Sequence, residues 1–324
     1  MKRSSFFISV LALAASSAMA QSTVNISGTV DAGVSKRTGQ AAKLQSDGSR
    51  ASQITFSGQE DLGTGLKATF LLSGYIDAST GHSDGLAKRN AYVGLESTQW
   101  GAVRFGRSYN PLYTHALTAS GEYGVESFQT IGTTLTDQGR VVSNQISYTS
   151  PSWRGLTGTF SYGFSEEKDL KDAVGLGIRY EGGPLVATYV ASRTTTNFPG
   201  TDSKYIQQLG AGYDFGVMRL LGTVQHDPNL VDHKLAYSVG FTAPIGRGTA
   251  WASYDHRQMV GDNLNVVQAG YKYDLSKRTQ LYGQVAYRNR STNLGINTHW
   301  GPWPLGGIGT NDSTGYGVGL SHSF

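Results

Sequence analysis

Hydrophobic and polar residues alternate one by one along many segments of the chain. Leu235 to Ile245 (LAYSVGFTAPI) and Asn265 to Leu275 (NVVQAGYKYDL) carry apolar or aromatic residues at nearly every second position. Leu66 to Ile76 (LKATFLLSGYI) follows the same pattern with Leu71 as an exception. This period of two is typical of β-strands with one apolar face. Such segments run for about ten residues, the length at which a tilted strand crosses a membrane.

Short turn signals rich in glycine, aspartate and serine separate these segments. From the fourth signal onward they recur at intervals of roughly thirty residues, which leaves room for two strands of membrane length and one longer loop. The signals lie at residues 63–65, 99–101, 152–155, 181–184, 214–216, 244–248 and 274–278. These hairpins, together with a first strand (Val24 to Val34) and a last strand (Tyr316 to Phe324), predict sixteen strands.

An even number of strands, with short turns on one side and long loops on the other, is typical of a closed bacterial outer-membrane barrel. The last strand must pair with the first, because each unsatisfied backbone group in lipid costs several kcal/mol. We therefore predict an all-β fold, a 16-stranded antiparallel transmembrane β-barrel that spans residues 21–324. A large soluble β-sandwich or solenoid is the alternative, although its strands would be shorter and its polar face less uniform.

Composition agrees with a β-rich, membrane-embedded chain. The sequence has 43 glycines, 18 tyrosines and no cysteine, and only 38% of its residues are hydrophobic. Without cysteine, neither disulfides nor thiolate metal sites are available. No long apolar helical stripes of the kind expected in a soluble protein of this size are present.

The N-terminus has the features of a secretory signal peptide, residues 1–20. Lys2 and Arg3 precede a short apolar stretch, and Ala18 to Ala20 forms an A-x-A cleavage site. The apolar stretch is too short to cross a bilayer as a helix. Removing Lys2 and Arg3 lowers the formal net charge from +4 to +2, and no cluster of basic residues indicates a nucleic-acid partner.

One interval between turns is much longer than the others, and its surplus lies in Asn110 to Gly139. A connection of this length usually has a function. It contains apolar residues such as Tyr113 and Phe128, more than a solvated surface loop would carry. Either it is an extracellular loop packed on its neighbours, or it folds into the lumen and narrows it. In the second case its acids, Glu122, Glu126 and Asp137, would face the channel.

Several segments, in this order and spacing, resemble the trimeric general porins of Gram-negative bacteria, neisserial type. They are SGQEDLGTGLKATF (57–70), RNAYVGLES (89–97), GAVRFGRSYNPLY (101–113), QISYTSPSWRG (145–155) and the terminal Phe324. The resemblance implies a homotrimer of sixteen-stranded barrels with the third loop (110–139) inside, located in the outer membrane against its lipid and lipopolysaccharide. It also implies that Phe324 helps the outer-membrane assembly machinery recognise the chain.

The resemblance further implies a constriction with a basic wall. By position, Arg89, Arg107 and Arg140 match basic residues that face the inward loop in relatives. Relatives commonly carry a further arginine where this chain has Gln53, so the basic wall is expected to be one charge weaker here.

Strict alternation alone does not place Arg89 and Arg107 on the inner face. Arg89 and Arg107 share their strand face with apolar residues that we place outward. A bulge at Gly106 would reset Arg107, and Arg89 would escape the alternation at a strand end. Alternation alone places a different set of charges inward: Arg104, Arg179, Arg219, Lys272 and Arg288, with Asp31, Glu96, Asp214 and Asp274. For each of these, a solvated wall charge without a specific role is the ordinary alternative.

No motif for catalysis, a cofactor or a metal is evident. The seven histidines are scattered without metal-ligand spacing, and neither a G-x-S-x-G elbow nor a Walker loop occurs. We therefore expect no enzyme and no cofactor.

Two functions remain: passive diffusion of small hydrophilic solutes and ions through a water-filled pore, and a surface-binding or adhesive barrel with a plugged lumen. Sixteen strands and a small-residue inner face favour the pore. Its selectivity is predicted to be a weak preference for anions.

Overall fold

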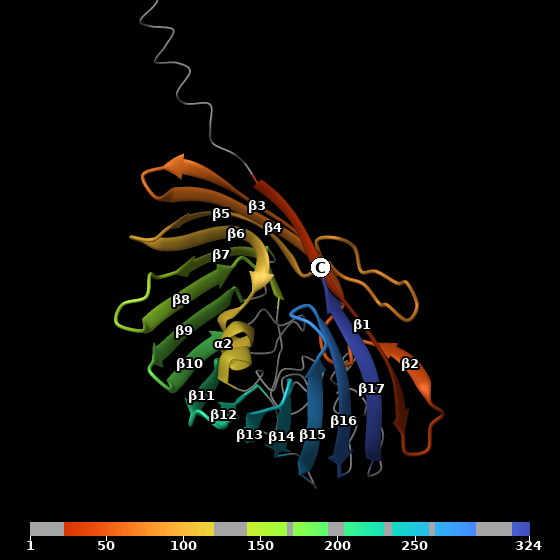
Figure 1. Ribbon diagram of the computed structural model, residues 1–324. Coiled ribbons are helices and arrows are strands. Elements are labelled where there is room, and N and C mark those ends of the chain that lie inside the picture. Colours follow the sequence, from red (N-terminus) through yellow and green to blue (C-terminus); the bar gives the residue numbers. More distant parts are fainter. Residues whose placement is uncertain are drawn as a thin grey trace, which may run out of the picture.

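The computed structural model describes residues 23–119, 141–166, 171–193, 204–229, 235–258, 263–289 and 313–324. Within these ranges, seventeen strands form one antiparallel sheet that closes on itself, and helix α2 lies inside the ring of strands (Figure 1). No helix in this part of the chain is both long enough and apolar enough to cross a bilayer.

The elements follow one another around the ring in chain order. Their bounds are β1 (Thr23–Arg37), β2 (Lys43–Ser46), β3 (Gln53–Gly63), β4 (Leu66–Tyr75), β5 (Asn90–Ser97), β6 (Gly101–Tyr109), α2 (Pro111–Ala119), β7 (Val141–Thr149), β8 (Leu156–Gly163), β9 (Ala173–Gly182), β10 (Leu185–Arg193), β11 (Ile206–Asp214), β12 (Arg219–His226), β13 (Leu235–Ile245), β14 (Gly248–Arg257), β15 (Leu264–Asp274), β16 (Thr279–Arg288) and β17 (Ser313–Ser323). All seven predicted turns join consecutive strands, from the β3–β4 hairpin to the β15–β16 hairpin.

Closure of the ring brings the two ends of the described chain together. On one side, β1 pairs with β17 from Thr29↔Ser323 to Arg37↔Gly315. On its other side, β1 pairs with β3 through residues 23–29 and with β2 through residues 32–35. Since β2 and β3 share one position in the wall, the seventeen strands occupy sixteen positions. The predicted 16-stranded barrel is confirmed.

The two faces of the wall differ as the alternation predicted. On β13, Ser238 is 2% exposed and its neighbour Val239 is 44% exposed. On β15, Gln268 is 2% exposed and Val267 is 51% exposed. Polar residues therefore face the interior and apolar residues face outward, which is the arrangement that a barrel with a wet interior needs in lipid.

The turn between β2 and β3, residues 47–52, folds against Asp31 of β1. Asp31 is fully buried, and its carboxylate accepts hydrogen bonds from three successive backbone amides, those of Gly48 (2.7 Å), Ser49 (3.1 Å) and Arg50 (2.9 Å). Alternation placed Asp31 on the inner face, but the interpretation as a solvated wall charge is wrong for this residue. Its carboxylate holds the turn instead.

Candidate functional site

Helix α2 forms the first part of the predicted inward segment and lies inside the barrel, against the inner face of β8 to β12 (Figure 1). Its start carries two local signals. Pro111 occupies the first helical position, and Asn110 Oδ1 accepts a 3.0 Å hydrogen bond from the backbone N–H of Tyr113, as an N-cap does. The inward fold of this segment is confirmed for its described part. The helix itself was not predicted, although the Asn110-Pro111 pair could have indicated it.

Two glycines on β9 allow α2 to approach the wall closely. A Cβ atom added to Gly175 would lie 2.6 Å from Pro111 Cδ, and one added to Gly177 would lie 2.7 Å from His115 Nε2. A side chain at Gly175 would therefore press on Pro111, and one at Gly177 would press on the ring of His115, so the helix or that ring would have to shift. Further along, Leu112 packs with Val190 of β10 and Ile206 of β11 in a small buried cluster. We call Gly175 and Gly177 the glycine seat of α2.

His115 is buried where α2 meets the glycine seat. Its Nδ1 is 3.1 Å from the carbonyl oxygen of Pro111, which can only accept, so this nitrogen is the protonated one in the neutral ring. Burial lowers the pKa of His115 to about 4; the Pro111 carbonyl opposes this shift and the charge of Arg179 adds to it. The imidazole is accordingly neutral at physiological pH.

Arg89, the first residue of the predicted basic wall, precedes β5 and is 3% exposed. Its guanidinium donates hydrogen bonds to Gln53 Oε1 (2.6 Å) and to the hydroxyl of Tyr109, and it stacks 3.9 Å above the ring of Tyr75. The expected position at a strand end is confirmed. Gln53 is thus a direct partner of Arg89.

Arg107 lies at an irregular point of the wall. The register between β6 and β7 shifts between Gly106 and Ser108, so the wall is irregular at the position where a bulge at Gly106 would reset Arg107. The Arg107 guanidinium donates to the backbone oxygen of Lys88 (2.8 Å) and to the hydroxyl of Ser143 (2.5 Å).

The shift in register leaves the other side of β6 unchanged. Towards β5, Arg107 pairs with Ala91 and Phe105 pairs with Val93 in one continuous register. Phe105 and Val93 are exposed, at 48% and 58%. This register groups Arg107 with the outward row, so its role at a constriction stays a prediction.

The remaining predicted constriction residues, Arg140, Glu122, Glu126 and Asp137, lie outside the described residues, as does the signal peptide (1–20). That the basic wall and the loop acids face each other across the lumen therefore stays a prediction.

The charged residues that alternation placed on the inner face lie in different environments. Arg104 and Arg179 line a pocket beside α2, and Arg288 is 4% exposed. Asp214 and Asp274 accept hydrogen bonds from groups at the neighbouring turns, the N–H of Gly216 (2.7 Å) and the amide of Gln280 (2.8 Å). Lys272 and Arg219 are half-buried, and Glu96 is exposed.

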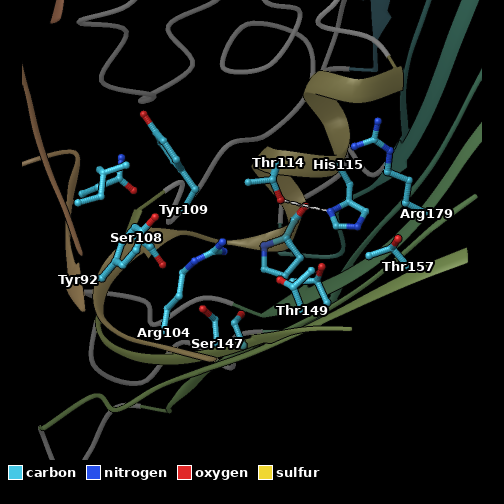
Figure 2. A pocket seen from close by; sticks show the side chains of 15 residues that line it. Tyr92, Arg104, Ser108, Tyr109, Thr114, His115, Ser147, Thr149, Thr157 and Arg179 are labelled. Carbon is cyan, nitrogen blue, oxygen red and sulfur yellow. Dashed lines mark hydrogen bonds between the residues drawn. The ribbon is translucent and has the colours of Figure 1, made fainter. Parts of the chain in front are cut away.

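The pocket beside α2 has a volume of about 430 Å³ and lies between the helix and strands β4 to β9 (Figure 2). Arg104, Tyr92, Ser108 and Tyr109 stand on one side of it, and His115 and Arg179 on the other (Figure 2). Serine and threonine hydroxyls of β7 and β8 form its floor: Ser147, Thr149, Thr157, Thr159 and Ser161. Leu71, the exception to the alternation of β4, also lines it. Neither this pocket nor any other part of the described ranges has a group of three or more His, Asp or Glu side chains that could hold a metal ion.

Comparisons with known proteins agree with this architecture. The family model of the Gram-negative porin matches residues 8–293. Outer membrane porin protein 32 of Delftia acidovorans is 34% identical over 358 residues, covering all of both chains. Major outer membrane protein P.IB of Neisseria meningitidis serogroup B is 26% identical over 348 residues, covering 97% of this chain and 98% of that protein.

Among solved structures, the anion-selective porin from Comamonas acidovorans superimposes with a TM-score of 0.79 at 29% identity, covering 94% of this chain and all of that one. The wall geometry, the helix inside the barrel and these matches lead to one conclusion: the chain belongs to the Gram-negative porin family.

Proposed function

We propose that the protein is a general diffusion channel of the outer membrane with a weak preference for anions. The observation that carries this proposal is a closed barrel of sixteen wall positions whose inner face is polar and whose interior holds α2. A barrel of this size leaves an aqueous channel, and an inward segment narrows it. The function is transport without catalysis, and no cofactor takes part.

The preference for anions rests on arginine. We propose that Arg89, Arg107 and Arg140 form the basic wall and that Glu122, Glu126 and Asp137 face it from the loop. Arg89 supports this assignment, because its guanidinium is held in the wall by Gln53, Tyr75 and Tyr109. The similar porin from Comamonas acidovorans is described as anion-selective. An uncharged Gln53 keeps the preference weak.

Reversal potentials under a salt gradient test the proposal. Replacing Arg89, Arg107 or Arg140 by serine should shift the potential towards cations, because a fixed positive charge in a narrow channel raises the local anion concentration. Arg247→Ser, in the β13–β14 turn outside the strands, is the matched control and should leave the potential unchanged. If conductance and potential stay constant while thermal stability falls, the arginines only hold the loop to the wall, and the selectivity proposal is wrong.

The assembly is proposed to be a homotrimer in the outer membrane, in contact with its lipid and lipopolysaccharide, after removal of residues 1–20. The resemblance to trimeric porins and the apolar outer face support this, since large apolar side chains are exposed on most strands of the wall. Native mass measurement in detergent tests it, and a monomer at all concentrations would contradict it.

A further inference from the structure

We propose that the pocket beside α2 binds a tetrahedral oxyanion, carried by inorganic phosphate or by a small phosphate ester. This deepens the diffusion function proposed above, on which it rests for the access of solutes to the lumen. The pocket adds a place where such solutes are retained.

The charge of the pocket has one sign. Arg104 and Arg179 both line it, and among the described residues that line it none carries a carboxylate. Arg179 forms an ion pair with Glu181, which stands outside the lining. Arg104 therefore brings a positive charge that no described lining residue neutralises, which favours an anionic ligand and disfavours a cation.

Arg104 is the strongest single candidate for contacting the ligand. Among the described residues, its guanidinium contacts the ring of Tyr92 at 5.4 Å, and the structure shows no hydrogen bond or ion pair to it. A guanidinium presents five N–H donors in a rigid plane, and this fork matches two oxygens of a phosphate at once. Arg104 thus offers donors that the rest of the described chain leaves unused.

The floor of the pocket supplies further donors at suitable spacing. Arg104, Ser147 and Ser161 form one row across β6, β7 and β8, and Thr149 pairs with Thr159 in the next row. Cross-strand neighbours have Cβ atoms about 5 Å apart, which brings several hydroxyls around a single tetrahedral group. Within the described ranges these hydroxyls make no hydrogen bond that would compete with a ligand.

The size of the pocket leaves room for more than a bare oxyanion. Its volume of about 430 Å³ falls within the range of pockets that hold small organic ligands. Tyr92 and Tyr109 border the side next to Arg104, where they can cover the apolar face of a sugar (Figure 2). Inorganic phosphate and a sugar phosphate would share the contacts to Arg104 and to the floor.

Binding is tested on the folded protein in detergent, without a membrane, so that its outcome is separate from that of conductance measurements. Inorganic phosphate is titrated at constant ionic strength and binding is followed by calorimetry, with glucose 6-phosphate as the second arm. We expect saturable binding of either probe. Binding of both identifies the oxyanion as the recognised group, and binding of the ester alone adds recognition of its sugar.

Substitutions locate the site. Arg104→Gln should lower the affinity between about 10-fold and 100-fold, the usual effect of losing hydrogen bonds to a charged group. Arg104→Lys keeps the charge without the fork and should fall between that variant and the unmodified protein. Arg219→Gln, a wall arginine outside the pocket, is the matched control and should leave the affinity within about twofold.

A second variant keeps the test valid if Arg104→Gln does not fold. Thr149→Val removes one floor hydroxyl at nearly constant volume and should lower the affinity about 2-fold to 10-fold. The proposal is overturned if the unmodified protein binds neither probe at millimolar concentration. Equal losses for Arg104→Gln and Arg219→Gln would overturn it as well, because binding would then follow total charge.

Discussion

The hydroxyl of Tyr282 on β16 donates a 2.7 Å hydrogen bond to Asp31 Oδ1 on β1, across the intervening strand β17. Glycines make this crossing possible. A Cβ atom at Gly33 would lie 2.8 Å from the Tyr282 hydroxyl, and side chains at Gly48 and Gly319 would collide with the same ring. The tyrosine thus spans the junction where the last strand meets the first.

We predict that Tyr282→Phe destabilises the closed barrel. The change removes the donor but keeps the ring, leaving a buried carboxylate with one partner fewer, which costs about 1–3 kcal/mol. Urea unfolding in detergent or lipid vesicles measures this loss. Tyr316→Phe, on the exposed outer face, is the control and should change the free energy of unfolding by no more than about 0.5 kcal/mol. Equal effects of the two substitutions would show that the hydrogen bond contributes nothing.

A methyl group in the glycine seat should displace helix α2. In Gly177→Ala the new Cβ atom would meet the His115 ring at 2.7 Å, so the helix must move away from β9 or the contact must be strained. We expect a changed single-channel conductance together with lower stability, by about 1–3 kcal/mol for overpacking. Gly222→Ala is the control, since its Cβ atom would meet only a backbone oxygen at 3.6 Å. An unchanged conductance in Gly177→Ala would show that the helix does not set the channel's width.

Burial of His115 makes the protein less stable in acid. Its folded pKa of about 4 lies below the value near 6.5 expected in the unfolded chain, so the unfolded chain binds the proton first. Stability from this group is therefore complete above pH of about 6.5 and falls as the pH drops towards about 4. His115→Asn should flatten this part of the curve of unfolding free energy against pH. An unchanged curve in His115→Asn would contradict the assignment.

Asp47, in the turn between β2 and β3, should have the opposite effect on the pH dependence of stability. Burial raises its pKa to about 6, against hydrogen bonds from Ser52 and Ser46 that lower it. Because the folded protein binds this proton before the unfolded chain does, stability from this group increases as the pH falls from about 6 to about 4. Asp47→Asn should therefore stabilise the protein at pH 7, by no more than about 3 kcal/mol. This gain should shrink as the pH approaches about 4, and a gain that is independent of pH would contradict the explanation.

Phe324 lies at the same junction. Its backbone N–H donates to Gly28 O (3.0 Å), and its carbonyl oxygen accepts from the Gly28 N–H (3.1 Å). If assembly machinery recognises this residue, its deletion should lower the amount of folded barrel in the outer membrane of cells. Refolding of the purified variant in detergent is the control, because it requires no machinery. Unchanged insertion in cells would refute the role of Phe324 in recognition.

Much of the wall could be predicted because its signals are local. Ser238 and Val239 differ in exposure as their alternation requires. Six of the seven turns contain glycine, and the turn at 274–278 contains aspartate and serine. The contact between Asp31 and Tyr282 could not be predicted in this way, since 251 positions separate the two residues. No sequence pattern next to Asp31 or Tyr282 indicates that the two residues are in contact.

Only part of the candidate site could be predicted from local sequence patterns. The sequence allows Arg89 to leave the alternation at a strand end, and Arg89 does lie directly before β5. Arg104 and Arg179 were placed inward by parity, but their shared pocket depends on how α2 sits against β9. The roles of Arg107, Arg140 and the loop acids stay predictions, because they depend on contacts beyond the described residues.

The glycine seat has a consequence for how channels of this kind diverge. The depth at which α2 lies against the wall depends on two positions that have no side chain, Gly175 and Gly177. We expect a single methyl group there to alter the width of the lumen while strand number, register and every charge remain the same. Permeability can therefore be retuned by substitutions that neither a charge map nor a hydropathy profile would reveal.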